Sequence, residues 1–75
     1  MLTFKLISID DGFYHYEIYP EGIEKDKGWI IFNPKTGETK ERVKPNSPFN
    51  CFSHFFQGVK DKDGNYKESG MVAWY

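Results

Sequence analysis

The sequence predicts a small α+β domain: a predominantly antiparallel sheet of five strands in the order β-β-β-β-α-β, with one amphipathic helix packed on one face. Two long runs rich in β-branched and aromatic residues flank a turn at residues 10–12, which indicates a hairpin. A phenylalanine-rich segment after residue 47 has the periodicity of a helix, and an apolar segment follows it. We expect the 75 residues to form a single domain over residues 1–75.

The composition shows which residues have to form the core. Seven Phe, five Tyr and two Trp supply most of the large apolar side chains, and a domain this short needs a dense core. The single Ala and the many aromatic and β-branched residues argue against an all-helical fold. Ten basic and eleven acidic residues are interspersed and give a net charge of −1. The chain therefore offers no large basic field for phosphate backbones.

The first hairpin pairs Leu2–Ile9 with Phe13–Tyr19, and its turn decides the register. A two-residue loop would set Leu6 opposite Glu17 and would mix charge into both faces. A three-residue loop with Gly12 at positive φ gives one apolar and one charged face, so we predict that loop. The expected pairs are then Lys5 with Glu17, Phe4 with Ile18, Leu6 with Tyr16 and Ser8 with Tyr14.

The middle of the chain predicts a surface loop and a second hairpin. Residues 20–28 are polar and bounded by Pro and Gly, so we expect a loop, with Ile23 tucked under it. Trp29–Phe32 is a short apolar strand, and residues 33–37 form the next turn. Glu38–Val43 is nearly all charged, which is typical of a strand at the edge of a sheet.

A helix and a last strand complete the predicted fold. Ser47 is the expected N-cap, with Pro48 at the first helical position and Gly58 just after the end. A spacing of about 100° per residue places the apolar residues on one side of this helix. These are Phe49, Cys51, Phe52, Phe55 and Phe56. Residues 61–65 form a turn, and Met71–Tyr75 is predicted to join the sheet.

No constellation in the sequence indicates a catalytic or metal site. Cys51 and His54 point about 60° apart on the predicted helix and lack a third orienting group, so we expect an inert core cysteine and a solvated histidine. With His15 they are the only nitrogen and sulfur candidates for zinc, and their spacing fits no zinc motif. Residues 61–65 resemble a calcium loop, but Gly70 falls where a bidentate Glu is required. We expect no cofactor, no metal and no enzymatic activity.

The side of the first hairpin that faces away from the predicted helix is the candidate binding surface. Four apolar residues there, Ile7, Ile9, Phe13 and Tyr19, are too many for a fully solvated face. Either the 20–28 loop and Trp29 cover this side, or it contacts a protein partner or a second copy of the chain. The predicted patch is Lys5, Ile7, Phe13, His15, Glu17 and Tyr19.

These observations predict a small protein-interaction module or inhibitor of unknown partner, without catalytic activity of its own. The alternative is a single-stranded nucleic-acid-binding module that uses exposed strand aromatics. Glu17 among those aromatics and the missing positive field argue against nucleic acid. Charges at Lys5 and Asp10 interrupt any signal-peptide core, and no apolar run reaches the ~20 residues that span a bilayer. We therefore expect a cytoplasmic protein that does not act at a membrane.

Overall fold

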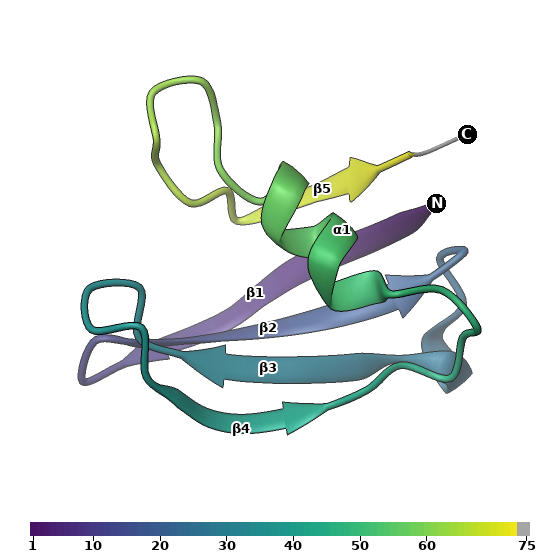
Figure 1. Cartoon of the computed structure of the whole chain (residues 1–75), viewed down its shortest axis with the longest axis horizontal. Coiled ribbons are helices and arrows are strands. Elements are labelled where there is room, and N and C mark those ends of the chain that lie inside the picture. The colour runs from purple at the N-terminus through teal and green to yellow at the C-terminus, as the bar shows by residue number, and fades with distance from the viewer. Residues whose placement is uncertain (74–75) are drawn as a thin grey trace.

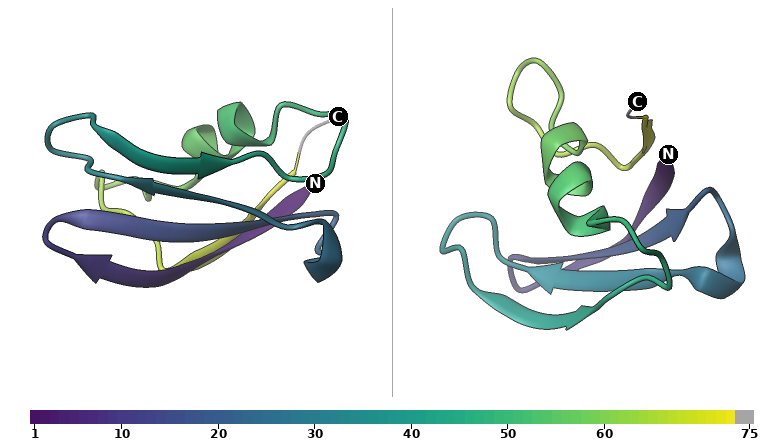
Figure 2. Two further views of the ribbon diagram at one scale, coloured as in Figure 1. Left: turned by 90° about the horizontal axis from the view of Figure 1, so that it is seen from below. Right: turned by 45° about the vertical axis from the view of Figure 1, so that its right-hand side comes forward.

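The computed structural model describes residues 1–73 and has the predicted element order (Figure 1). The elements are β1 (Leu2–Asp10), β2 (Phe13–Pro20), the short 3₁₀ helix η1 (Glu24–Asp26), β3 (Gly28–Phe32), β4 (Thr39–Val43), α1 (Cys51–Gly58) and β5 (Ser69–Val72). Among these residues the strands form one antiparallel sheet in the order β4-β3-β2-β1-β5. The helix α1 lies on one side of this sheet (Figure 2). The α+β prediction is confirmed.

The first turn differs from the prediction, because it is a two-residue loop. Asp11 and Gly12 both have positive φ, at 54° and 81°, which is the conformation of a type I′ turn. This turn is common in hairpins because its twist matches that of the flanking strands. Ile9 consequently faces Tyr14, and the predicted pair of Ser8 with Tyr14 is wrong.

A bulge at Ile7 restores the predicted register in the centre of the hairpin. Leu6 faces Tyr16 and Ser8 faces His15, so Ile7 is the extra residue on β1. Beyond the bulge the expected pairs are all present: Lys5 with Glu17, Phe4 with Ile18 and Leu6 with Tyr16. The bulge thus reconciles a tight type I′ turn with one apolar face, because it absorbs the one-residue shift.

The core lies between the sheet and α1. Its buried side chains are Leu2, Phe4, Tyr16, Ile18, Ile30, Phe32, Cys51, Phe55 and Val59. The ring of Phe55 packs edge-on against Phe4 and Tyr16, with centroid distances of 5.4 and 5.0 Å, a favourable geometry for aromatic pairs. The Tyr16 hydroxyl donates a 2.7 Å hydrogen bond to the Lys67 carbonyl, so its polar atom is satisfied in the core.

The helix begins at Cys51 rather than at Pro48. Asn50 is the N-cap, and its Oδ1 accepts a 3.2 Å hydrogen bond from the Ser53 N–H. The predicted cap, Ser47, instead accepts from the Phe49 N–H within a turn that precedes the helix. The helix also includes Gly58, which was expected just beyond it.

The helix buries fewer of the predicted apolar residues than expected. Cys51 and Phe55 are buried and Phe52 is half-buried, as the predicted apolar arc requires. Phe49 and Phe56, also assigned to that arc, are 49% and 44% exposed. Phe49 lies before the first helical turn, so it does not take part in the helical periodicity.

The segment after the helix covers the rest of the core. Tyr66 packs against Phe32, with ring centroids 5.8 Å apart. Residues 61–65 form the expected turn, in which the Asp61 carboxylate accepts from the N–H groups of Asp63 and Asn65. The last described strand is Ser69–Val72, which begins two residues before the predicted start at Met71; the predicted residues Trp74 and Tyr75 lie outside the described residues.

Candidate interaction surface

The sheet has a second face, which points away from α1 and which we call the outer face. Residues paired across antiparallel strands share a face, so the register identifies its members. On β2, β3 and β4 its half-buried members are Phe13, His15, Glu17, Tyr19, Trp29, Ile31 and Val43. Glu41, which lies opposite Ile31, is an exposed member. The outer face is therefore a mainly aromatic and aliphatic surface that the helix does not cover.

Glu17 lies in the middle of the outer face and is held by two partners. Its carboxylate accepts a 2.7 Å hydrogen bond from the Tyr19 hydroxyl and lies 2.9 Å from the Lys27 ammonium. The bond from Tyr19, followed by that from Lys27, lowers the pKa of the Glu17 carboxyl below its ordinary value. Burial and the bond to Glu17 raise the pKa of Tyr19 to about 12. The acid at the centre of the face is thus ionised and paired in place.

Two further polar contacts border the aromatic residues. The Trp29 indole N–H donates a 2.6 Å hydrogen bond to the Glu41 carboxylate on β4. The Lys40 ammonium lies 5.5 Å from the ring centroid of Phe13, within the range of a cation–π contact. The Trp29 N–H thus has a hydrogen-bond acceptor, and the Phe13 ring has a cation beside it. The apolar parts of the half-buried side chains on this face remain partly exposed.

The structure brings together five of the six residues predicted for the patch. Phe13, His15, Glu17 and Tyr19 alternate along β2 and lie on the outer face. Lys5 pairs with Glu17 across the hairpin, so it lies on the same face, where it is exposed.

Ile7 and Ile9 of β1 were expected on the outer side of the hairpin, but neither pairs with a residue of the outer face. Ile7 is the unpaired residue of the bulge and is 44% exposed. Ile9 was expected on the outer side, but it pairs with Tyr14 and so shares the side of the core. The type I′ turn causes this difference, because it shifts the register between the bulge and the turn.

The loop at residues 20–28 contacts the outer face through Lys27 and η1. Its Lys27 reaches Glu17, as described above, and η1 contacts β2. Ile23 is 43% exposed and is therefore not tucked under the loop. Trp29 is itself part of the outer face rather than a cover over it.

Three half-buried members of the outer face were missed from the sequence: Trp29, Ile31 and Val43. Trp29–Phe32 reads as a continuous apolar run, which is typical of a strand covered on both faces. In the structure Ile30 and Phe32 are buried beneath α1, while the alternate residues Trp29 and Ile31 face outward. The alternation of strand side chains was the signal that could have assigned them.

Residues 1–73 offer few further groups that could take part in catalysis or metal binding. Cys51 is a buried free thiol at the base of the helix. Among residues 1–73 no three His, Cys, Asp or Glu side chains gather in a way that could hold a metal ion. Nor does any helix in that range have the length and apolarity needed to cross a bilayer.

Comparisons of the chain with known protein families, with curated proteins and with solved structures give no match. The geometry of the outer face is therefore the main guide to function.

Proposed function

We propose that this protein is a small interaction module, that its outer face is the contact surface, and that the occupant of this face is a second copy of the same chain. The single observation that supports the proposal is the row of half-buried residues Tyr19, Trp29, Ile31 and Val43 on the sheet face opposite α1. Apolar patches of this kind on a sheet commonly mark protein contact sites. The buried free thiol Cys51 supports a reducing, cytoplasmic setting for such a module.

The extent of the sheet leaves room for a dimer contact. The Cα positions of the whole domain extend over 31 × 26 × 17 Å, and the strands β2, β3 and β4 that carry the outer face occupy part of the two longer directions (Figure 1). Since a standard interface uses roughly 800 Å² per partner, a dimer would have to engage most of this face. Two such faces can pack as aligned sheets, about 10 Å apart, as in a β-sandwich.

The charges of the face favour a second copy over a strongly charged partner. Lys5, Lys27 and Lys40 lie on or beside it together with Glu17 and Glu41, so neither sign dominates. A two-fold arrangement can place each sign opposite the other, because an isologous interface repeats every contact twice. A highly acidic or basic partner would meet like charges somewhere on this surface.

Sedimentation equilibrium of the wild type and of Ile31→Lys tests the proposal. Ile31 lies opposite Glu41, so a lysine there can pair with that carboxylate in the monomer, but a dimer interface would have to remove its charge from water. We expect a concentration-dependent dimer for the wild type and a monomer for Ile31→Lys. The matched control is Ile9→Lys, since Ile9 is 54% exposed and lies on the other side of the sheet. That control should dimerise like the wild type.

Three outcomes would contradict the proposal: a wild-type monomer over the whole concentration range, equal dimerisation of Ile31→Lys, or loss of the dimer in Ile9→Lys as well. A wild-type monomer that retains single-stranded oligonucleotide in a salt-sensitive manner would favour the nucleic-acid alternative instead. Circular dichroism of each variant would establish that the fold is retained.

A further inference from the structure

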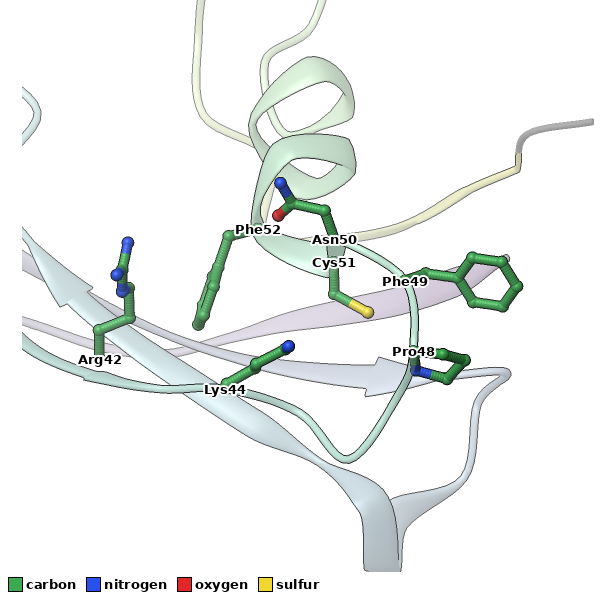
Figure 3. Close-up of a pocket in the computed structure, with 7 residues that line it drawn as sticks. All are labelled: Arg42, Lys44, Pro48, Phe49, Asn50, Cys51 and Phe52. Atoms are coloured by element: carbon green, nitrogen blue, oxygen red, sulfur yellow. The ribbon is translucent and has the colours of Figure 1, made fainter.

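A pocket lies on the opposite side of the sheet, between the edge strand β4 and the start of α1 (Figure 3). It has a volume of about 400 Å³, within the range of about 300–1,000 Å³ that is usual for small-molecule sites. Arg42 and Lys44 form one wall, while Cys51 and Phe52 form the other. The pocket therefore combines two cations with an apolar wall.

The register explains why the two cations lie here. Arg42 pairs with Ile30, a core residue, so it projects to the side of the sheet that α1 covers. Lys44 is two residues further along the chain and lines the same pocket. Residues on the helix side of an edge strand normally join the core, but here α1 packs mainly against β5, β1 and β2 rather than against β4 (Figure 1).

Within residues 1–73 no carboxylate neutralises these cations. None of the described residues that line the pocket is acidic, and neither Arg42 nor Lys44 forms an ion pair in that part of the chain. The neighbouring Glu41 faces the other side of the sheet, where it accepts from Trp29. Two positive charges therefore meet in the pocket without a counterion from the described residues.

The aromatic wall also orients the arginine. The guanidinium carbon of Arg42 lies 5.4 Å from the ring centroid of Phe52, which is within the range of a cation–π contact. A guanidinium held against a ring keeps its N–H groups available at its edge, and this edge matches the two oxygens of a carboxylate. Both Arg42 and Lys44 are exposed, so a ligand from solvent can reach them.

We propose that this pocket binds a small organic carboxylate with an apolar body. The carboxylate would accept hydrogen bonds from the Arg42 guanidinium and pair with the Lys44 ammonium, and the apolar body would lie against Phe52. The site is separate from the outer face, because Arg42 and Ile31 lie on opposite sides of the sheet. Its occupation does not depend on the self-association proposed above.

NMR titration of the ¹⁵N-labelled full chain with phenylacetate and with phenylacetamide tests this site. The two probes differ in charge but share their apolar ring. We expect phenylacetate to shift the amides of residues 42–44 and 50–52, and phenylacetamide to bind at least about tenfold more weakly, as the loss of a charge-assisted hydrogen bond implies. Equal binding of the two probes, or shifts confined to other residues, would overturn the proposal.

Substitution of Arg42 or Lys44 tests whether these two cations bind the carboxylate. Arg42→Gln and Lys44→Gln should each weaken phenylacetate about tenfold or more. The matched control is Lys60→Gln, because Lys60 also lies near an aromatic ring, 5.2 Å from that of Tyr66, but outside the pocket. It should bind like the wild type. If Lys60→Gln weakens binding equally, or if inorganic phosphate binds as well as phenylacetate, the surface is a general cation patch and the proposal is wrong.

Discussion

The two faces of the sheet are built from the same strands, yet they have different physical properties. On the face beneath α1, Phe4, Tyr16, Ile18 and Ile30 are each no more than 2% exposed. On the outer face, their direct neighbours in the sequence, such as Glu17 and Tyr19, are half-buried; the Tyr19 hydroxyl donates a hydrogen bond to Glu17, which also forms an ion pair with Lys27. The comparison shows that cover by the helix, rather than the strand composition alone, separates core from surface in this small domain.

The difference in exposure between the two faces also predicts which measurements a substitution on each face changes. Residues beneath α1 have their apolar area removed from water by the fold itself, so they stabilise the monomer. Residues on the outer face keep part of that area exposed, and this area becomes useful only when another surface covers it. Substitutions on the two faces should therefore change different measurements, and the following predictions are designed to break or sharpen that contrast.

The largest effect is expected at Phe55. This ring is 0% exposed and packs between Phe4 and Tyr16, so Phe55→Ala should lower the free energy of unfolding by about 3–5 kcal/mol. Ile31→Ala, on the half-buried outer face, should cost about 1–2 kcal/mol, because less area is lost from a packed environment. Urea denaturation at low protein concentration measures both. Equal losses would mean that the two faces contribute alike to the monomer.

An intermediate effect is expected from Tyr16→Phe. This change keeps the ring but removes the hydroxyl that donates to the Lys67 carbonyl, at a cost of about 1–2 kcal/mol near neutral pH. Burial, with smaller contributions from Tyr14, Tyr66 and Glu68, raises the pKa of Tyr16 to about 12. Because the folded state disfavours ionisation, the stability that Tyr16 supplies is complete below pH 10 and falls as the pH rises from 10 towards 12.

The alkaline dependence provides the check on this prediction. The stability difference between the wild type and Tyr16→Phe should shrink as the pH rises above 10, since only the wild type retains the hydroxyl that ionises on unfolding. Denaturation at several alkaline pH values measures that difference. A difference that stays constant would show that the Tyr16 hydroxyl titrates in the folded protein as it does in the unfolded chain.

The fold class could be predicted because it depends on strong and repeated signals. The alternation along Phe13–Tyr19 and the apolar arc around Phe55 each require one particular kind of element. Their burial on a common core then leaves few arrangements. The edge position of β4 was also predictable, because charged side chains discourage pairing with further strands.

The register near the first turn could not be predicted, because two one-residue shifts in opposite directions cancel in the middle of the hairpin. The turn at Asp11 and Gly12 shifts the register by one residue, and the bulge at Ile7 shifts it back. A search for one uniform register finds the strand centre and misses both. Likewise Ser47 and Asn50 are both good cap residues, and only the path of the chain after β4 selects Asn50.

The candidate surface was predicted in part, for a related reason. The residues on β2 follow from the hairpin alone, whereas Trp29, Ile31 and Val43 join them only through the pairing of β3 and β4. That pairing depends on contacts distant in the sequence. Similarly, Arg42 and Phe52 meet in the pocket only because α1 starts near the end of β4 (Figure 3).

The smallest effect on the monomer is expected from the Glu17 carboxylate. Its pKa is lowered in the folded state by Tyr19 and Lys27, so it stabilises the fold above its ordinary pKa of 4.5 and loses this contribution as the pH falls through the folded value. The stability difference between the wild type and Glu17→Gln should therefore shrink between neutral pH and pH 3. It should be smaller throughout than the effect of Tyr16→Phe, because partly exposed ion pairs contribute little.

The control for Glu17 is Glu24→Gln, which removes the second and more distant acid near Lys27. Its carboxylate lies 3.9 Å from that ammonium and its side chain is 82% exposed, so its removal should leave the acid dependence of stability nearly unchanged. Tyr19→Phe should move the pKa of Glu17 back towards its ordinary value, measured by NMR titration of the carboxyl carbon, because it removes the largest cause of the shift. If Tyr19→Phe leaves the pKa of Glu17 unchanged, the hydrogen bond from Tyr19 does not stabilise the Glu17 carboxylate, and this difference between the outer face and the core face is wrong.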